Sequence, residues 1–478
     1  MSRTVIIGGG IAGLATAFYL QECGVTDYTL IECSPRLGGK ITSAAHDGFL
    51  VEGGPDSFIT QKTAALDLCA RLGLSDQLVG SNTGKQATTF VWSGNRLHPM
   101  PEGMMLMAPT MVLPFLRSRL ISWPGKLRMG MELFVPKQPT SQDESLACFV
   151  RRRLGSEALN KIAGPLMGGI HAADPEKLSL ASTFPMFQEM ERKHGSLLRG
   201  MMRRPRHRPT PGTKPKPMFM SLQGGLQKLS DALVAQLRAN AIRTGCCALA
   251  VSPHGDQYRV VLSDGGTILA DNIVFATPAY VTADLVQQID PVLATRLRDI
   301  PYVSTATVSL GFKRSDIAHP MTGAGFIVPF SEGRRITACS WSSAKFNHRA
   351  PEDSVLLRVF IGGALAEPLA EQDDTALIAL ALEELRTIMG ITAAPVLAKA
   401  YRWNKANPQY DLGHGERINE IDHAIAACPG LYLAGAAYRG AGIPDCILSG
   451  MIAARAIAER LHTNRPYHDV HAPACIGA

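Results

Sequence analysis

The chain has 478 residues, of which 46% are hydrophobic, and a formal net charge of +7. This length exceeds what one compact core usually supports, so two or three domains are expected. The sequence lacks an apolar run of about 18 residues, the minimum for a membrane-spanning helix, which argues against an integral membrane protein. An apolar strand pattern already begins at Thr4. We therefore expect no signal or transit peptide, and a cytoplasmic protein.

The positive charge is concentrated in one proline-rich segment. Six arginines and lysines lie within residues 203–217, so the rest of the chain is nearly neutral. The segment favours a solvated linker. The alternative is a contact with anionic lipid, where each charge contributes about 1 kcal/mol, and a peripheral position on the inner face of the cell membrane. No aromatic residues alternate with the charges, so nucleic acid is not an expected partner.

Ten cysteines are scattered along the chain without a C-x-x-C pair. Several fall in helical or strand patterns (Cys69, Cys148 and Cys339), and we expect most cysteines to be core residues in a reducing compartment. The adjacent Cys246 and Cys247 are interpreted as structural. No group of His and Cys has the spacing of a zinc site, so no metal is predicted.

The most informative stretch is the glycine-rich turn that follows the apolar residues 4–7. Its G-x-G-x-x-G spacing consists of Gly8, Gly10 and Gly13, and a helical pattern begins at once. These glycines permit a sharp turn, a close approach of a pyrophosphate and tight packing of helix on strand. The phosphates would lie at the helix N-terminus, where free N–H groups favour anions. A dinucleotide site is therefore favoured over a βαβ crossover without ligand.

A carboxylate strengthens this prediction. Glu32 ends a second apolar strand over residues 28–31, about 20 residues after the glycines, where an acidic residue holds the ribose hydroxyls. A negative charge at this place disfavours a 2′-phosphate, so an NADP-type ligand is not expected.

The next patterns, in chain order, predict a change of domain. Residues 62–80 have the pattern of an amphipathic helix, and residues 89–97 that of a β-hairpin. A methionine-rich apolar stretch begins at Met104 and leads into helical patterns, which predict a helical second domain. Helical core is the first interpretation of this region. An apolar surface that enters a bilayer leaflet and a lid over an apolar ligand are the alternatives.

The pattern changes again after residue 217. A helix to about residue 239 and a buried parallel strand over 272–275 continue the nucleotide-binding fold. Alternating strands between residues 300 and 400, with a helix over 373–389, predict an antiparallel sheet. A strand, a glycine turn and a helix over 430–461 then close the nucleotide-binding domain.

Three elements together resemble the FAD-binding amine oxidase superfamily: the opening glycine turn, the E-x3-R-x-G-G pattern from Glu32 to Gly39, and the closing turn Leu433-Ala434-Gly435. The resemblance implies an α/β fold. In it, a discontinuous Rossmann-like FAD-binding domain carries an inserted α+β substrate domain with an antiparallel sheet, and a helical subdomain. The closing turn would direct a helix N-terminus at the flavin, where it stabilises the negative charge of the reduced form.

The chain divides accordingly into three kinds of domain. The predicted segments are residues 1–83, 218–299 and 400–462 for the FAD-binding domain, 300–399 for the substrate-binding domain, 84–202 for the helical subdomain, 203–217 for the basic loop and 463–478 for the tail.

Further motifs look like the protoporphyrinogen oxidase family, which includes bacterial coproporphyrinogen III oxidases. The resemblance runs from residue 1 to about residue 461. The matching segments are Glu52–Phe58, Leu97–Pro101, Phe149–Leu154, Gly169–Pro175, Leu178–Pro185, Lys193–Leu197, Pro408–Tyr410 and Gly442–Cys446.

The resemblance implies FAD as the cofactor, held largely by loops. Ala248 would contact the adenine through its backbone, at a place where valine is common. The implied FAD contacts are Gly8, Gly9, Gly10, Ile11, Ala12, Gly13, Glu32, Cys33, Arg36, Gly38, Gly39, Lys40, Gly54, Pro55, Asp56, Ser57, Ala248, Trp403, Gly435, Ile443, Pro444 and Asp445.

For the porphyrinogen substrate, the matching positions are Gly169, Ile327 and Phe346. Ile327 and Phe346 would sandwich the macrocycle, and core packing is the alternative role for both. In some family members an arginine just before the hairpin strand pairs with a propionate. That place is a threonine here, and Lys62 or Arg96 is the predicted replacement.

The implied reaction is the six-electron oxidation of protoporphyrinogen IX, coproporphyrinogen III or both to the porphyrin in heme biosynthesis, with three O₂ reduced to three H₂O₂. Flavin N5 accepts hydride, the catalytic side chain is unknown, and His171 and His414 are expected to be structural. The implied partners are the porphyrinogen, O₂ and a ferrochelatase that receives the product, with a monomer or homodimer as the assembly. The alternatives are another flavin amine oxidase, a carotenoid-type desaturase, or a non-enzymatic escort protein of the same fold.

Overall fold

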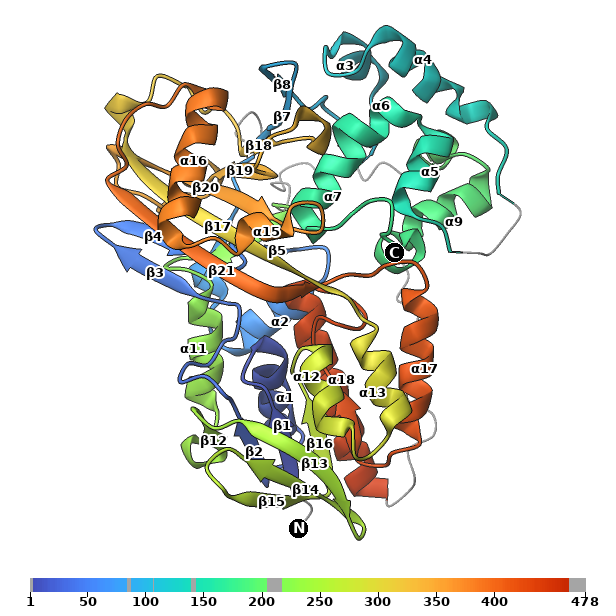
Figure 1. The fold of residues 1–478 in the computed structure, drawn as a ribbon, viewed down its shortest axis with the longest axis vertical. Helices are drawn as coiled ribbons and strands as arrows, with labels where there is room; N and C mark the ends of the chain where they lie inside the picture. The colour runs from blue at the N-terminus through green and yellow to red at the C-terminus, as the bar shows by residue number, and fades with distance from the viewer. Residues whose placement is uncertain (1–2, 84–86, 106, 139–142, 204–216, 464–478) are drawn as a thin grey trace.

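The computed structural model describes residues 3–83, 87–105, 107–138, 143–203 and 217–463 (Figure 1). The predictions for the basic segment and for the C-terminal tail fall almost entirely outside these residues. Within the described part of the chain, no helix is both long and apolar enough to cross a membrane.

A parallel five-stranded sheet forms the lower part of the molecule in Figure 1. The three central strands are buried along their whole length, which explains their continuous apolar runs. One strand of this sheet lies at residues 4–7 and another at residues 431–433, close to opposite ends of the chain. This confirms the predicted discontinuous domain. In sheet order the strands are β12 (Ile242–Arg243), β2 (Tyr28–Ile31), β1 (Thr4–Ile7), β16 (Asn272–Phe275) and β22 (Leu431–Leu433).

Helices and a small sheet cover the two faces of this parallel sheet. Alternate residues of β1 point to opposite faces: Ile6 packs in one apolar cluster, and Val5 and Ile7 in the other. The first face carries α1 (Ile11–Glu22), α2 (Ala64–Arg71), α11 (Gln227–Gln236) and α18 (Ile443–Thr463). The second face carries α12 (Ala279–Val286), α13 (Pro291–Arg298), α17 (His414–Ala426) and the antiparallel strands β13 (Ala248–His254), β14 (Gln257–Leu262) and β15 (Thr267–Ala270).

A seven-stranded sheet forms the middle of the molecule and packs against α16 (Asp374–Met389). Its pairings are antiparallel except for β18 with β7. The hairpin predicted at residues 89–97 is confirmed, and it extends this sheet rather than joining the helices. In sheet order the strands are β21 (Leu397–Pro408), β17 (Tyr302–Lys313), β20 (Ser354–Gly362), β19 (Ala338–Trp341), β18 (Gly325–Ile327), β7 (Thr89–Ser93) and β8 (Arg96–Pro99).

Further short strands and helices complete the fold, and the two helices named here pack on the seven-stranded sheet. The strands are β3 (Ser43–His46) with β4 (Phe49–Glu52), and β11 (Phe219–Leu222) between β5 (Phe58–Ile59) and β6 (Leu78–Gly80). The helices are α14 (Ser342–Lys345) and α15 (Glu367–Ala370).

The helical region lies at the top of Figure 1 and has its own apolar cluster. Ile327 of the seven-stranded sheet belongs to this cluster, so the helices pack directly on the sheet. The region contains the small hairpin β9 (Met104–Met105) and β10 (Ala108–Pro109), and α3 (Val112–Arg117), α4 (Trp123–Gly130), α5 (Leu146–Arg153), α6 (Ser156–Ala158), α7 (Gly164–His171), α8 (Leu180–Thr183), α9 (Pro185–His194) and α10 (Leu197–Arg203).

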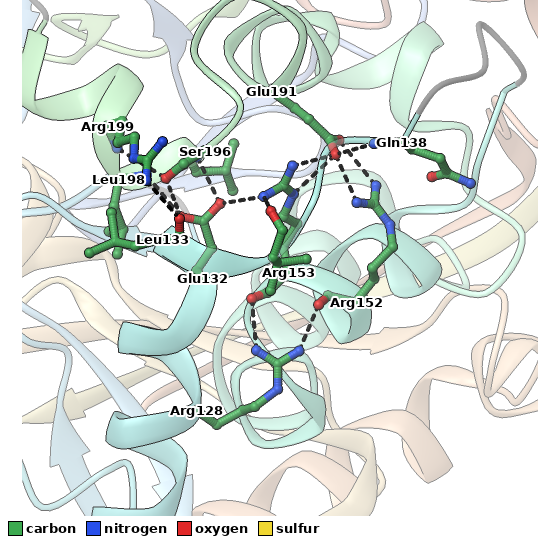
Figure 2. Close-up of polar contacts among 12 residues, drawn as sticks. Arg128, Glu132, Leu133, Gln138, Arg152, Arg153, Glu191, Ser196, Leu198 and Arg199 are labelled. Carbon is green, nitrogen blue, oxygen red and sulfur yellow. Dashed lines mark hydrogen bonds and ion pairs between the residues drawn. The ribbon is translucent and has the colours of Figure 1, made fainter.

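A buried ion network fastens these helices together (Figure 2). The Arg153 guanidinium and the Glu132 carboxylate are fully buried, with Nη1 and Oε1 3.1 Å apart, and Arg153 also pairs with Glu191. Arg152 reaches the same Glu191 at 2.8 Å, and Arg128 donates to the carbonyl oxygens of Arg152 and Arg153. Removing one partner of such a network typically costs about 3–5 kcal/mol, because it leaves a buried charge unpaired.

Three sequence predictions are wrong in detail. The helix predicted over 62–80 ends at Arg71, because Gly73 adopts a left-handed φ of +70° and the chain then turns into β6. Cys69 and Cys339 are buried, but Cys148 is exposed because it lies on the outer side of α5. The prediction of reduced cysteines is also wrong for Cys33 and Cys247, which form a disulfide.

Candidate active site

The glycine-rich turn between β1 and α1 is packed too closely for side chains. A Cβ on Gly13 would lie 1.9 Å from the carbonyl oxygen of Gly8, and a Cβ on Gly8 would lie 2.7 Å from the carbonyl oxygen of Ala276. Gly8 also has a φ of +111°, which disfavours other residues. The turn therefore exposes backbone N–H groups at the N-terminus of α1, as a pyrophosphate requires.

A second glycine pair lies against this turn. The Gly38 N–H donates to the carbonyl oxygen of Gly9 at 2.8 Å, and a Cβ on Gly39 would lie 3.0 Å from the Cα of Gly10. Arg36 was predicted as a cofactor contact, and its guanidinium donates to the carbonyl oxygens of its own loop, including that of Ile41 at 2.8 Å. Arg36 thus orders the loop that brings the two glycine segments together.

The turn Gly8–Gly13 together with Gly38 and Gly39 is called the cradle below. Glu32 lies at its predicted adenosine end. Its carboxylate accepts the N–H of Gly9 at 2.6 Å and the N–H of Ser34 at 2.8 Å. The disulfide between Cys33 and Cys247 brings Ala248 beside it, although more than 200 residues separate the two segments. Glu32, Cys33 and Ala248 are predicted contacts of one cofactor, and the fold brings them together at the ends of β2 and β12.

The loop of residues 53–57 approaches the cradle from the seven-stranded sheet. A Cβ on Gly54 would lie 1.8 Å from the carbonyl oxygen of Lys40, so only glycine fits. The carbonyl oxygen of Gly53 accepts hydrogen bonds from the Trp403 indole at 2.8 Å, from Thr307 at 3.2 Å and from Arg358 at 3.4 Å. Three neighbouring strands thus hold one turn of the predicted cofactor loop.

Sequence reasoning missed Arg358 and Thr307. Arg358 is 4% exposed and also donates to the carbonyl oxygen of Gly54. The available signal was a lone arginine inside the apolar strand 354–362, because a buried cation needs a specific partner.

Asp56 and Lys345 form a covered ion pair beside this loop. Their Oδ2 and Nζ atoms lie 2.9 Å apart. Burial alone would raise the pKa of Asp56, but the charges of Lys345 and Arg358 outweigh burial and hold the pKa well below its usual range. Asp56 is therefore a carboxylate at neutral pH, which supports a structural role and argues against a proton donor.

The closing turn at the other end of the cradle returns to α1. Gly435 has a φ of +117° and its N–H donates to Ser449 Oγ at 2.9 Å. A Cβ on Gly450 would lie 2.4 Å from the carbonyl oxygen of Ala12, so α18 and α1 are in direct backbone contact. Ile443 and Pro444 form the first turn of α18, which lies beside α1 (Figure 1).

Two predicted residues with different roles meet here. Asp445 in the first turn of α18 pairs with Lys62, with Nζ 2.7 Å from Oδ1 and 2.9 Å from Oδ2. Burial, and then the nearby charge of Lys62, lower the pKa of His171 to about 4, so this imidazole is neutral at pH 7. The Gln409 amide donates to the His171 carbonyl oxygen at 3.2 Å. This cluster joins the end of α7 to the start of α18.

The remaining predicted substrate residues lie in different surroundings. A Cβ on Gly169 would lie 3.9 Å from Ile327 Cγ2, so α7 and β18 meet at these two residues. Phe346 is 1% exposed, and its ring lies against the cations of Lys345 and Arg349 at 5.2 and 5.4 Å. Arg96 is exposed at the hairpin turn, where it pairs with Ser93. The structure thus brings Gly169 and Ile327 together, and the roles of Phe346 and Arg96 stay predictions.

The described residues contain no group of three or more His, Cys, Asp or Glu that could hold a metal ion. The chemistry of these residues fits FAD: the two glycine segments would bind its phosphates, Glu32 its ribose, and the closing turn would lie at its flavin. The buried glycines leave room for backbone N–H groups to reach a ligand, which is the property that a dinucleotide requires.

This cradle and its inserted sheet define a flavin-dependent oxidoreductase. Residues 11–458 match the family described as flavin containing amine oxidoreductase. The chain belongs to this family, and within it to the porphyrinogen oxidases. It is 38% identical over 459 residues to coproporphyrinogen III oxidase of Bacillus subtilis, covering 94% of this chain and 97% of the relative. Its cofactor is FAD.

Two further comparisons support the same family and fold. The chain is 29% identical to a chloroplastic protoporphyrinogen oxidase of Oryza sativa over 487 residues, covering 96% of this chain and 88% of the relative. A crystal structure from Exiguobacterium sp. 255-15 has a TM-score of 0.85 at 34% identity, covering 96% of this chain and 99% of the other. The fold is therefore shared along the whole described chain.

Proposed function

We propose that the chain is an FAD-dependent, oxygen-linked porphyrinogen oxidase whose substrate is coproporphyrinogen III. The observation that carries this proposal is the level of similarity. Three bacterial relatives named coproporphyrinogen III oxidase are 34–38% identical, whereas the plant relatives named protoporphyrinogen oxidase are 25–29% identical. Coproporphyrinogen III carries two more carboxylates than protoporphyrinogen IX, so the choice between them is a matter of charge recognition.

When bound, FAD supplies two-electron oxidation of a substrate carbon and reoxidation by O₂. The chain's own residues bind and orient. Glu32 would accept hydrogen bonds from the ribose hydroxyls, and the glycine segments would present N–H groups to the phosphates. The clamp of Thr307, Arg358 and Trp403 on Gly53 would hold the 53–57 loop at one position relative to the seven-stranded sheet. Cofactor and substrate surfaces are thus fixed to the same sheet.

The substrate side combines an apolar contact with a cation. Gly169 and Ile327 would form an apolar surface, and the missing side chain of Gly169 would leave space for a flat macrocycle to pack on it. Lys62, whose side chain is 55% exposed, would meet a substrate carboxylate while it stays paired with Asp445. His171 is neutral beside this pair, so it adds no second positive charge. Each oxidation step extends the conjugation of the ring, which lessens the need for a strong side-chain base.

The test is a comparison of the two porphyrinogens on the purified protein, with porphyrin fluorescence and H₂O₂ as readouts. We expect kcat/KM to be higher for coproporphyrinogen III by at least about tenfold, the worth of one added charged contact of about 1.4 kcal/mol. Equal values, or a preference for protoporphyrinogen IX, would assign the second substrate instead. Turnover of amines without porphyrin formation would contradict the proposal.

We also propose a peripheral contact between the helical region and an anionic membrane. Its support is an outward apolar surface over α3, α4 and the turn that follows them, with Val112, Trp123, Leu127 and Phe134 each 69–81% exposed. Arg117 at the end of α3 is exposed and adds a positive charge to this surface. Glu132, the acidic residue between Val112 and Phe134, is buried. Insertion of such side chains into a headgroup layer is favourable because apolar area leaves water.

Co-sedimentation with vesicles tests this contact. We expect Trp123→Ser with Phe134→Ser to lose binding to vesicles with anionic lipid, while a version that lacks residues 204–216 separates the role of the basic segment. Binding that is unchanged in the double variant would contradict the proposal. Transfer of the product to a ferrochelatase and the choice between monomer and homodimer stay predictions.

A further inference from the structure

A disulfide lies at the edge of the predicted adenosine site. It joins Cys33 to Cys247, which are 214 positions apart in the sequence and whose Cα atoms are 4.2 Å apart. Cys33 directly follows Glu32, and Cys247 directly precedes Ala248. Because Glu32 is predicted to hold the ribose and Ala248 the adenine, the bond connects the two segments that would hold the adenosine half of FAD.

The backbone on both sides of the bond is ordered by other contacts. The Glu32 N–H donates to the carbonyl oxygen of Arg243 at 2.8 Å, and the Cys246 N–H donates to the carbonyl oxygen of Glu32 at 3.1 Å. The Cys247 N–H donates to Ser263 Oγ at 2.9 Å, and the Ser263 N–H donates to the carbonyl oxygen of Cys247 at 2.9 Å. The two cysteines therefore meet because the fold aligns their segments.

The adjacent Cys246 has a different environment. Successive side chains of an extended backbone point to opposite faces, so Cys246 enters the core and is 6% exposed. Its Sγ lies 3.8 Å from the Asp264 carboxylate. Cys33, in contrast, is exposed to solvent. The pair therefore has one sulfur that a small reactant can reach, and a partner already in bonding position.

We propose that Cys33 and Cys247 form a redox modification site that sets how tightly the chain holds FAD. The disulfide adds a covalent restraint between the Glu32 and Ala248 segments beyond that of the backbone hydrogen bonds, and reduction to two thiols removes this restraint. A hydroperoxide is the class of oxidant, and a small thiol is the class of reductant. Such a restraint strengthens binding because the two segments lose less conformational freedom when the ligand binds.

The oxidation is balanced for one molecule of H₂O₂. The Cys33 thiol loses its proton, its sulfur attacks one peroxide oxygen, and the O–O bond breaks to give a sulfenic acid and hydroxide, which takes up that proton to form water. The Cys247 thiol then loses its proton and attacks the sulfenic sulfur, the S–S bond forms, and the hydroxide that leaves takes up this second proton to form water. Two thiols lose two electrons and two protons, and the peroxide gains them. The supply of H₂O₂ by the chain itself rests on the proposed function, whereas the site does not, because any hydroperoxide serves.

The direct test is the rate of FAD release from the holoenzyme on dilution, followed by flavin fluorescence. Treatment with a phosphine reductant should make release about tenfold faster, within the range of 5- to 150-fold that is typical of coupled sites. The variants Cys33→Ser and Cys247→Ser should release FAD as fast without reductant and should not respond to it. The matched control is Cys148→Ser, which removes an exposed thiol on α5 and should behave as the unaltered protein.

Equal or slower release after reduction would overturn the proposal, since the disulfide would then be structural or would obstruct the cofactor. Peptide mass spectrometry must show the linked Cys33 and Cys247 peptides before reduction and their return after added H₂O₂. Failure of the link to form with peroxide would equally overturn it. Neither assay uses a porphyrinogen, so the failure of this proposal and the failure of the proposed function are separate results.

Linkage provides a second readout. If the disulfide tightens FAD binding tenfold, then FAD must favour the disulfide tenfold, which corresponds to about 30 mV in the thiol–disulfide potential. Glutathione redox buffers with and without excess FAD measure this shift by thiol labelling. An unchanged potential would contradict the coupling.

Discussion

The parallel-sheet domain and the helical region are held together in opposite ways. The cradle of the parallel-sheet domain is made of backbone: a Cβ on Gly13 or on Gly54 would come within 2 Å of a carbonyl oxygen. The helical region depends on side chains, because Arg153, Glu132 and Glu191 form a buried ion network within it (Figure 2). Close backbone packing thus determines the shape of the cradle, and paired buried charges hold the helices together.

The comparison predicts different sensitivities. A side chain added to the cradle cannot be accommodated, so the effect falls on FAD binding. A side chain removed from the network leaves a charge unpaired, so the effect falls on stability.

The largest effect is expected for Gly13→Val. Its Cβ would lie 1.9 Å from the Gly8 carbonyl oxygen, so the turn must open. We expect loss of bound flavin, seen as loss of flavin absorbance in the purified protein. Gly130→Ala is the control, since its Cβ would meet nothing within 4 Å. A Gly13→Val protein that retains stoichiometric FAD would show that the cradle is not the cofactor site.

Arg153→Met should lower the free energy of unfolding by about 3–5 kcal/mol, because it leaves Glu132 buried without its cation and removes one of the two arginines that pair with Glu191. Denaturant unfolding measures the loss. Arg151→Met is the matched control: its pair with Glu176 is about half exposed, so a change of about 0–1 kcal/mol is expected. Equal effects of the two variants would contradict the difference between the network and the surface.

Stability should depend on pH through His414. This residue is 2% exposed, its ring stacks on Tyr410 at 4.1 Å, and burial lowers its pKa to about 4. The unfolded chain binds a proton below pH 6.5 and the folded chain does not, so the stabilising contribution is complete above pH 6.5 and is lost as the pH falls toward 4. We expect a contribution of about 3 kcal/mol to this fall.

Unfolding measured from pH 4 to 7 checks this. His414→Gln should show a shallower fall in stability across the window, and the exposed His254→Gln should not. Parallel curves for His414→Gln and the unaltered protein would place the pH dependence elsewhere.

The smallest effect should come from Arg358→Gln, which loosens the clamp on Gly53 and Gly54. Loss of hydrogen bonds from a charged donor costs about 1.5–3 kcal/mol. We expect FAD to bind about tenfold more weakly, as a titration of the apoprotein would measure. Arg402→Gln on β21 of the same sheet, which removes a partly exposed pair with Asp374, should leave FAD binding unchanged. If both variants bind FAD normally, the clamp does not position the loop.

The same comparison explains what could be predicted from the sequence. The turn from Gly8 to Gly13, Glu32 and the strand 272–275 are local patterns, and each was predicted because local sterics dictate glycine spacing and burial dictates apolar runs. The hairpin 89–97 was predicted as a hairpin, but its pairing with β18 was not, since nothing in a strand pattern names its neighbour.

The contacts that sequence reasoning missed are all long-range. Arg358 and Gly54 are far apart in the sequence, and the cysteine pair is separated by 214 positions. The first contact is created by the inserted seven-stranded sheet, and the second by the pairing of β12 with β2 in the parallel sheet. The end of α2 at Arg71 was missed for a different reason. The apolar spacing continues past Arg71, but the left-handed backbone of Gly73 ends the helix.

The most direct test of the central claim is a single turnover without oxygen. The holoenzyme is mixed with coproporphyrinogen III under anaerobic conditions, and the oxidised flavin absorbance is followed in time. The proposed function predicts rapid loss of this absorbance, followed by its return and by H₂O₂ when O₂ is admitted. An absorbance that persists with coproporphyrinogen III and with protoporphyrinogen IX, but falls with an amine, would contradict it.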